Sequence, residues 1–179
     1  IDEAYVDFVS DATHDLTQFA VEAPNVLLLR TLSKGYGLAG LRFGYGVGCR
    51  NIIHPMITKT RDSYNLDAIS QALATAAIMD RAYAAGTWAK INTERKNLSN
   101  TLTIMGFEVL PSQGNFVLAT VPTGPLTAEQ LFEGLKVSGV LVRFFNEPRL
   151  HDKLRITIGS PEENQRLVTS LGALLDKGD

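Results

Sequence analysis

The chain has 179 residues, of which 45% are hydrophobic and 20% charged, and its formal net charge is −2. This is the composition of an ordinary globular protein that is long enough for one or two compact units. The charge balance gives no reason to expect a nucleic acid or an anionic membrane as a partner, and no apolar run approaches the length of a membrane span.

Cysteine and histidine are sparse. Cys49 is the single cysteine, so no disulfide can form within the chain, which fits a reducing cytoplasm. The three histidines are scattered, lie away from any acidic cluster and lack the spacing of metal ligands; they are His14, His54 and His151. The sequence therefore predicts no metal site.

The first half of the chain combines short strands with helices. After a polar, partly helical connection, the apolar pattern predicts two strands and then two helices, over 26–30, 43–48, 51–60 and 66–85. Gly44, Gly46 and Gly48 alternate with larger residues in the second strand, which suits close packing against a neighbouring helix.

The second half changes to shorter elements. A helix is predicted over 87–105, and Gly106 ends it. Capping boxes begin two further helices, one at Thr127 and one at Ser160. Between them, strands are predicted over 107–110, 115–121, 140–145 and 154–158. A domain boundary is therefore expected near residue 85, with an α/β part before it and a small α+β part after it.

Lys34 stands out among the candidate functional residues. It follows a buried strand and a run of small and hydroxylated residues, and it opens the glycine-broken loop Gly35-Tyr36-Gly37. Such a loop can present one amine at the rim of a sheet, where it can form an imine with an aldehyde. The alternative is a solvated lysine on a loop, which is the usual state of a lysine.

Five segments resemble the pyridoxal-phosphate-dependent aminotransferases of fold type I, and most closely their histidinol-phosphate aminotransferase branch. They are DEAYVDF at 2–8, RTLSKGYGLAGLR at 30–42, Tyr64-Asn65-Leu66, PSQGNF at 111–116 and LRITIGSPEEN at 154–164. The resemblance implies the C-terminal part of that α/β fold. Residues 1–85 would be the remainder of the large cofactor-binding domain, and residues 86–179 the small C-terminal domain.

The same resemblance assigns residues to the cofactor, pyridoxal 5'-phosphate. Lys34 would form the imine with its aldehyde and then move a proton during catalysis. Asp2 would pair with the pyridine nitrogen, Tyr5 with the phenolic oxygen, and Ser33 and Arg42 with the phosphate. The alternatives are a frayed acid for Asp2 and, for Tyr5, a half-buried ring whose hydroxyl contacts water.

Two arginines and one asparagine are candidates for the substrate. Arg155 lies in an apolar strand, where a guanidinium needs an anionic partner. The resemblance implies the substrate α-carboxylate, and the alternative is a structural salt bridge. The same resemblance implies that Arg143 binds a substrate phosphate. A structural salt bridge is an equally favoured alternative for Arg143. Asn115 would line the site or close a turn.

The implied parent enzyme transfers an amino group between histidinol phosphate and the 2-oxoglutarate/glutamate pair in histidine biosynthesis, as a cytoplasmic homodimer with small-molecule substrates. Other enzymes of this fold stay open, namely an aromatic or other class I/II aminotransferase and a phosphothreonine decarboxylase-like enzyme. A different alternative is a non-catalytic truncated remnant. The resemblance places the ring-stacking and partner-subunit residues in a first half that this sequence lacks, so the chain alone is expected to be inactive.

Overall fold

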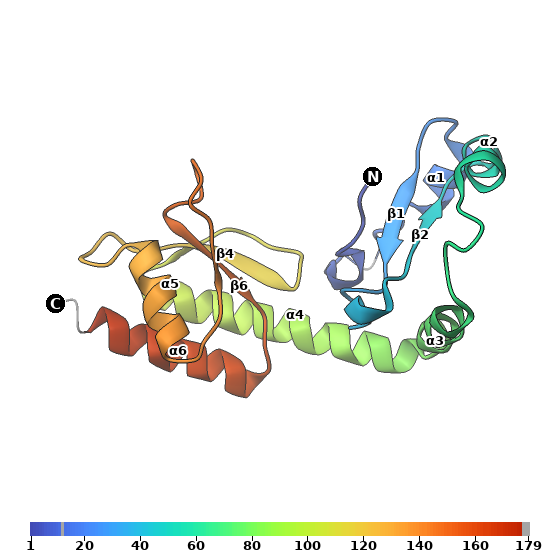
Figure 1. Ribbon diagram of the computed structural model, residues 1–179. Helices are drawn as coiled ribbons and strands as arrows, with labels where there is room; N and C mark the ends of the chain where they lie inside the picture. The colour runs from blue at the N-terminus through green and yellow to red at the C-terminus, as the bar shows by residue number, and fades with distance from the viewer. Residues whose placement is uncertain (12, 177–179) are drawn as a thin grey trace. The chain divides into compact units, whose positions relative to one another are not determined.

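The computed structural model describes residues 1–11 and 13–176 (Figure 1). They form a mixed α/β fold, as predicted, in two compact units, Ile1–Ala89 and Lys90–Asp179. The division falls between Ala89 and Lys90, inside the long helix α4 (Arg81–Ile104), whereas the sequence places a domain boundary near residue 85. No helix in the described part of the chain is both long and apolar enough to cross a membrane.

The first unit is built on a two-stranded antiparallel sheet. Strand β1 (Leu28–Thr31) pairs with β2 (Gly44–Val47), with Leu28 opposite Val47 and Thr31 opposite Gly44. The N-terminal residues run parallel to β1 on its other edge, because the Leu29 N–H donates to the Ile1 carbonyl at 2.9 Å and the Glu3 N–H donates to the Leu29 carbonyl at 2.8 Å. Strand β1 is therefore held on both sides.

Gly44 of β2 and Gly48 just after it lie close to the backbone of the neighbouring segment, whereas the sequence predicts close packing against a helix. A β-carbon at Gly44 would lie 3.0 Å from the Arg30 carbonyl oxygen, and one at Gly48 would lie 3.0 Å from that of Val26. The close neighbour at Gly44 is thus the backbone of β1 and not a helix. Only at Gly48 does a helical side chain, Ile53, come within 3.6 Å of such an atom.

Helical segments make up most of the rest of this unit. Three are single turns or little longer: η1 (Val6–Phe8), α1 (Thr17–Glu22) and η2 (Ala39–Leu41). The helix predicted over 51–60 is α-helical only as α2 (Arg50–Pro55) and continues as the π-helical turn η3 (Met56–Thr60), where the Arg61 N–H reaches back to the Met56 carbonyl.

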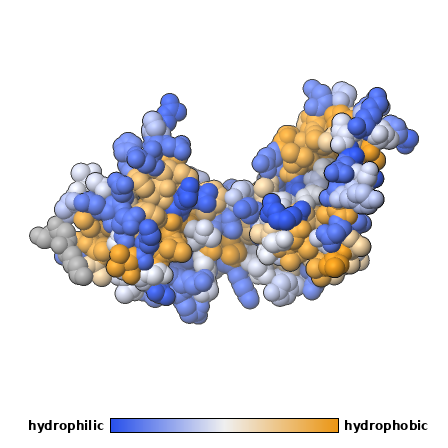
Figure 2. Space-filling view, in the orientation of Figure 1, coloured by the Kyte–Doolittle hydropathy of each residue, from blue (hydrophilic) through white to orange (hydrophobic). Residues whose placement is uncertain are grey.

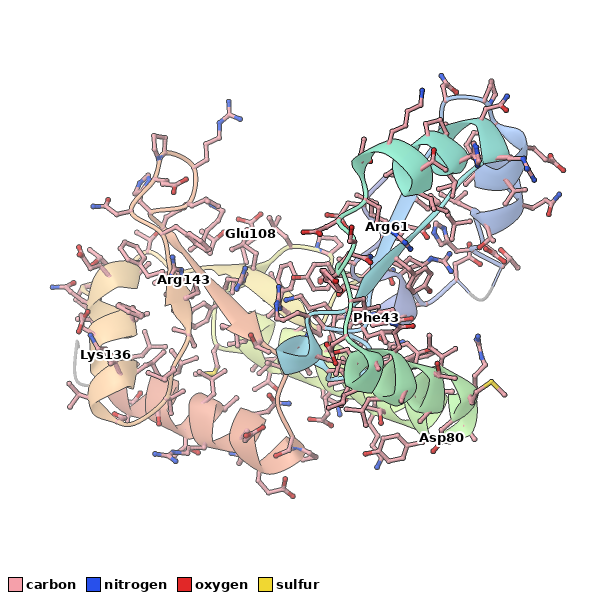
Figure 3. The ribbon with its side chains drawn as sticks, turned by 45° about the vertical axis from the view of Figure 1, so that its right-hand side comes forward. Phe43, Arg61, Asp80, Glu108, Lys136 and Arg143 are labelled. Carbon is pink, nitrogen blue, oxygen red and sulfur yellow. The ribbon has the colours of Figure 1, made fainter. Side chains whose placement is uncertain are left out.

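The break between the two long helices also differs from the prediction. Helix α3 (Ala68–Met79) ends before Asp80, and α4 begins directly after it. The Asp80 carboxylate accepts a hydrogen bond from the Tyr83 N–H at 3.2 Å, as a residue that caps a helix N-terminus does (Figure 3). Gly86 therefore lies inside α4, where a glycine costs about 1 kcal/mol relative to alanine but does not break the helix.

Helix α3 leaves most of its apolar residues exposed. Of its side chains only Ser70 and Ala74 are buried, while Ile69 is 72% exposed and Met79 is 79% exposed. Figure 2 shows an apolar surface over this helix, at the lower right of the view.

The second unit is a four-stranded antiparallel sheet in the order β3-β4-β6-β5. The four strands are β3 (Glu108–Val109), β4 (Phe116–Thr120), β5 (Arg143–Phe144) and β6 (Lys153–Thr157). Strands β3, β4 and β5 are shorter than predicted, and β6 has the predicted length but begins one residue earlier. The helices α5 (Ala128–Val137) and α6 (Pro161–Leu175) begin with the two predicted capping boxes, at Thr127 with Gln130 and at Ser160 with Glu163.

One face of this sheet is buried against the helices. Side chains alternate between buried and partly exposed along β4 and β6, as expected when a sheet packs on one side. The core joins sheet, α4, α5 and α6 through fully or nearly fully buried residues: Leu98, Leu102, Val117, Ala119, Leu131, Leu135, Leu154, Ile156, Leu167 and Leu171. The partly exposed side chains of Phe116, Leu118 and Arg155 lie on the opposite face of the sheet.

The capping box at α6 gives a direct test of how this unit is stabilised. Replacing Ser160 with alanine removes the acceptor for the Glu163 N–H and should lower the free energy of unfolding by about 1 kcal/mol. Urea unfolding followed by circular dichroism measures this. The exposed mid-helix variant Gln165→Ala is the control, and an equal effect of both variants would contradict the capping assignment.

Candidate active site

The Lys34 loop is a tight turn at the end of β1. The Leu38 N–H donates to the Leu32 carbonyl at 3.0 Å and the Gly37 N–H to the Lys34 carbonyl at 3.1 Å. Gly37 has a φ of +67°, a conformation that favours glycine. The Lys34 side chain is exposed, and its Nζ lies 5.6 Å from the centroid of the Tyr5 ring. The turn therefore exposes the amine beside the face of the Tyr5 ring.

The N-terminal motif is held beside this loop by its backbone. The Ile1 amino group donates to the Leu27 carbonyl at 2.8 Å, in addition to the two bonds with Leu29. Asp2 is exposed, and its Oδ1 accepts from the Ala4 N–H at 2.9 Å. Ile1 and Glu3, on either side of Asp2, both hydrogen-bond to the backbone of Leu27 or Leu29, so the backbone at Asp2 is not frayed in this structure.

Glu3 has a separate, structural role. Its side chain is buried, its Oε2 accepts from Arg30 Nε at 2.8 Å, and its Oε1 lies 3.2 Å from His14 Nε2. Burial alone would lower the pKa of Arg30, but the hydrogen bonds and charges of Glu3 and Tyr45 outweigh burial and raise it. His14 itself is exposed, and its contact with the single carboxylate of Glu3 lies at the edge of the buried pair of Glu3 and Arg30.

Ser33 and Arg42 are the residues predicted to hold a phosphate. Thr31 Oγ1 accepts from the Ser33 N–H at 3.1 Å and lies 2.9 Å from Ser33 Oγ, so two hydroxyls gather at the end of β1. Arg42 adopts a left-handed conformation with φ of 56°, and its Nη1 donates to the Ala39 carbonyl at 2.9 Å. Among the described residues no carboxylate pairs with Arg42, and its recorded partner is Ala39 and not Ser33 or Lys34.

The second unit places the two predicted substrate arginines directly opposite each other. Arg143 of β5 pairs in register with Arg155 of β6, so both side chains lie on the same face of the sheet. The guanidinium of Arg155 lies 5.3 Å from the ring centroid of Phe116 and 5.8 Å from that of Phe145, while that of Arg143 lies 5.2 Å from Phe145. Figure 3 labels Arg143 in this unit.

Arg155 has no anionic partner among the described residues. Its Nε is buried and makes no hydrogen bond to the described residues, and no carboxylate among them forms an ion pair with it. A structural salt bridge therefore has no partner in this part of the chain. Because a partly buried guanidinium gains from an anionic partner, the arginine pair is a place where an anionic group would bind favourably.

Asn115 directly precedes β4, next to the end of β6. Its carbonyl accepts from the Ile158 N–H at 2.9 Å, and its side chain is half-buried. The sequence analysis missed Arg95 of α4, which is 7% exposed and donates to the Gly114 carbonyl at 2.8 Å. Burial lowers the pKa of Arg95. Arg95 follows Glu94 in a long polar helix, and nothing in the local sequence marks it as buried. Its bond to Gly114 holds the loop before Asn115 in place.

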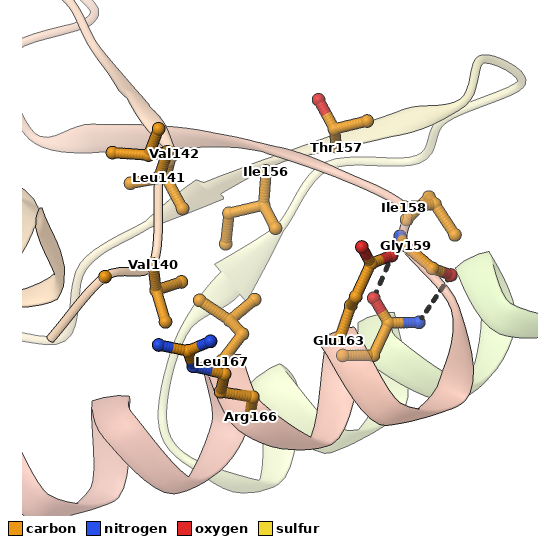
Figure 4. Close-up of a pocket in the computed structure, with 12 residues that line it drawn as sticks. Val140, Leu141, Val142, Ile156, Thr157, Ile158, Gly159, Glu163, Arg166 and Leu167 are labelled. Atoms are coloured by element: carbon orange, nitrogen blue, oxygen red, sulfur yellow. Dashed lines mark hydrogen bonds between the residues drawn. The ribbon is translucent and has the colours of Figure 1, made fainter.

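A cavity of about 360 Å³ lies on the other, helix-covered side of the sheet (Figure 4). Its polar lining is already bonded: Asn164 bonds both backbone groups of Gly159, Glu163 accepts from the Ser160 N–H, and Arg166 donates to the Ser138 carbonyl. None of the predicted site residues lines this cavity. Within the described ranges, no group of three histidine, cysteine or acidic side chains could hold a metal ion.

The chain belongs to the aminotransferase class I and II family, whose model matches residues 1–171. Among the curated relatives, it is 49% identical over 175 residues to histidinol-phosphate aminotransferase 1 of Trichormus variabilis, a match that covers 98% of this chain and 48% of that protein. The chain spans about half the length of the curated relatives that it matches.

Solved structures agree on the fold. The histidinol-phosphate aminotransferase of Sinorhizobium meliloti, solved with pyridoxal-5'-phosphate, matches with a TM-score of 0.87 at 27% identity, over 98% of this chain and 48% of that one. The enzyme of Clostridium acetobutylicum matches with a TM-score of 0.89 at 23% identity, over 99% of this chain and 54% of that one, and shows the shared fold alone.

Proposed function

We propose that the protein to which this chain belongs is a pyridoxal-phosphate-dependent aminotransferase that acts on histidinol phosphate in histidine biosynthesis. The observation that carries the proposal is the placement of the exposed Lys34 amine over the Tyr5 ring, which joins the two N-terminal motifs. The names of the relatives that match nearly the whole chain support the substrate.

The residues of the first unit fit the cofactor chemically. Lys34 and Arg42 are exposed cations without a carboxylate partner among the described residues, and Ser33, next to Lys34 in sequence, adds a hydroxyl. An arginine fork and a hydroxyl suit phosphate oxygens, and the amine of a lysine suits an aldehyde. Pyridoxal phosphate, when bound, supplies that aldehyde and a ring that withdraws electrons from the adjacent carbon.

Each residue then has a separate task. Asp2 would hold a proton on the ring nitrogen, since a carboxylate favours the charged form of a nearby base. Tyr5 would donate its phenolic hydrogen to the ring oxygen. Once released, the Lys34 amine would move a proton to and from the substrate α-carbon as a general base.

The second unit would bind the substrate. Arg155, with its Nε buried and without a hydrogen-bond partner in the described residues, would take the α-carboxylate of the glutamate or 2-oxoglutarate substrate. Arg143, exposed on the neighbouring strand, would take the phosphate, and Asn115 would line the site. A guanidinium suits either a phosphate or a carboxylate, and a pair of them lets the site take a phosphorylated substrate as well as glutamate. Such a site suits histidinol phosphate, which carries a phosphate and no carboxylate, better than an aromatic amino acid. The relatives' names do not favour a decarboxylase or a non-catalytic remnant.

We also propose that the protein works as a cytoplasmic homodimer. The exposed apolar side chains of α3 support an interface, because Ile69, Leu73 and Met79 are each more than half exposed. Light scattering of the purified protein should give the mass of two chains, and Ile69→Lys with Leu73→Lys should shift it toward one. A monomer mass for the unaltered protein at assay concentration would contradict the proposal.

The assignment of Lys34 predicts where the cofactor attaches. Borohydride reduction of the protein with pyridoxal phosphate should add the cofactor's mass to the peptide that carries Lys34, since reduction fixes an amine to the aldehyde that it has condensed with. Peptide mass spectrometry reads this out, and Lys59, an exposed lysine of the same unit, is the internal control. Labelling of another lysine in place of Lys34 would refute the assignment.

Replacing Arg155 and replacing Arg143 should affect different substrates in steady-state kinetics. Arg155→Ala should weaken transition-state stabilisation, measured from kcat/KM, by about 2–5 kcal/mol for every substrate with an α-carboxylate, because it removes a charge-assisted contact. Arg143→Ala should do so for phosphorylated substrates only. Steady-state assays with histidinol phosphate and with an unphosphorylated amino acid compare the two. Equal losses on both substrates in Arg143→Ala would remove the phosphate role from Arg143.

A further inference from the structure

Gly35, which follows Lys34, is held by a residue far away in the sequence. Gly35 is buried, and its carbonyl accepts a hydrogen bond of 2.7 Å from the indole N–H of Trp88, on the part of α4 that belongs to the first unit. The Trp88 ring also contacts the Tyr36 ring edge to face, with centroids 5.5 Å apart and planes at 86°. The backbone just after Lys34 is thus tied to a helix.

The Asp7 side chain packs directly against the α-carbon of Gly35. A β-carbon built there would lie 2.5 Å from the Asp7 β-carbon and clash still more with its carboxylate, closer than real β-carbons approach any atom. Asp7 lies in the turn η1 and is half-buried. Burial raises the pKa of the Asp7 carboxyl, and the charges of Arg30 and Arg81 oppose this. Residue 35 can only be glycine while Asp7 occupies this space.

We propose that Asp7 and Trp88 are positioning residues for Lys34, acting together through Gly35 as a Gly35 clamp. Asp7 fills the space beside the α-carbon of Gly35, and Trp88 fixes its carbonyl. The Lys34 carbonyl is bonded in turn to the Gly37 N–H. The backbone from Lys34 to Gly37 is therefore fixed at successive peptide groups, which leaves the lysine only its own side-chain rotations.

The clamp matters because Lys34 has to serve two partners. The proposal rests on the proposed function, in which its amine first meets an aldehyde and later an α-carbon. A displacement of about 1 Å between reacting groups can cost about 100-fold in rate. A lysine side chain is long and flexible, so its reach is defined only if its backbone is fixed. Neither Asp7 nor Trp88 needs to touch the cofactor for this.

Two sets of variants test the clamp. Trp88→Phe keeps an aromatic ring against Tyr36 but removes the hydrogen bond to Gly35, and Tyr83→Phe, at an exposed position on the same helix, is its control. Gly35→Ala introduces the clash with Asp7, and the double variant Asp7→Gly with Gly35→Ala removes that clash again. Asp7→Gly alone controls for the lost carboxylate.

Two readouts do not depend on turnover. Hydrogen exchange of the peptide over residues 33–38 in the cofactor-free protein should be about fivefold faster in Trp88→Phe, as expected for the loss of one hydrogen bond, and unchanged in Tyr83→Phe. In the loaded protein, the pH at which the visible absorption of the cofactor is half-titrated should move in Trp88→Phe and in Gly35→Ala. It should return toward the original value in the double variant.

The results separate the clamp from the proposed function. Unchanged exchange and an unchanged half-titration pH in Trp88→Phe would overturn the clamp, as would a double variant that is no better than Gly35→Ala. If Gly35→Ala does not fold, recovery of a folded, cofactor-binding protein in the double variant supports the clamp, and failure to recover overturns it. Borohydride labelling of Lys34 in the unaltered protein tests the proposed function by itself.

Discussion

The candidate site of the first unit depends on the pairing of residues 1–3 with β1. Two backbone hydrogen bonds to Leu29 fix the segment in register, and the buried contact between Glu3 and Arg30 fixes it sideways. Removing either charge of such a pair would leave the other uncompensated, which is strongly destabilising. Because Tyr5 follows directly in this segment, the pairing is what brings its ring to Lys34. The chemistry of two distant motifs thus rests on one edge of one strand.

The second unit shows how a stable sheet can carry an unfavourable group. Its hydrophobic core lies entirely on the helix-covered face, with Leu154 and Ile156 alternating with Arg155 along β6. The opposite face is free to hold guanidiniums between aromatic rings, where dispersion and cation–π attraction offset part of the lost hydration. No described carboxylate completes Arg155. This is the pattern expected where stability is given up locally for binding an anion.

Local signals made much of this fold predictable, and long-range contacts set the limit. The capping residues at Thr127 and Ser160 fixed two helix starts correctly, because the cap bonds form between neighbours in sequence. The sequence predicts the helix break at Gly86, but a glycine is tolerated within a helix when the flanking turns continue. The break lies instead at Asp80, whose carboxylate caps α4. Among the site residues, the loop of Lys34 is predictable from its glycines. The pairing of Arg143 with Arg155 joins residues 12 positions apart, and the contact of Asp7 with Gly35 joins residues 28 positions apart. Neither contact produces a periodic pattern in the sequence.

The central claim is that the N-terminal motif and the lysine loop form one site, with the Lys34 amine over the Tyr5 ring. Nuclear Overhauser spectroscopy of the cofactor-free protein, with lysine and tyrosine selectively labelled, measures this contact directly. The account predicts cross-peaks between the terminal methylene protons of Lys34 and the ring protons of Tyr5, because Nζ lies 5.6 Å from the ring centroid. The same cross-peaks should vanish in Glu3→Ala, which releases the segment. Their absence in the unaltered folded protein would contradict the account.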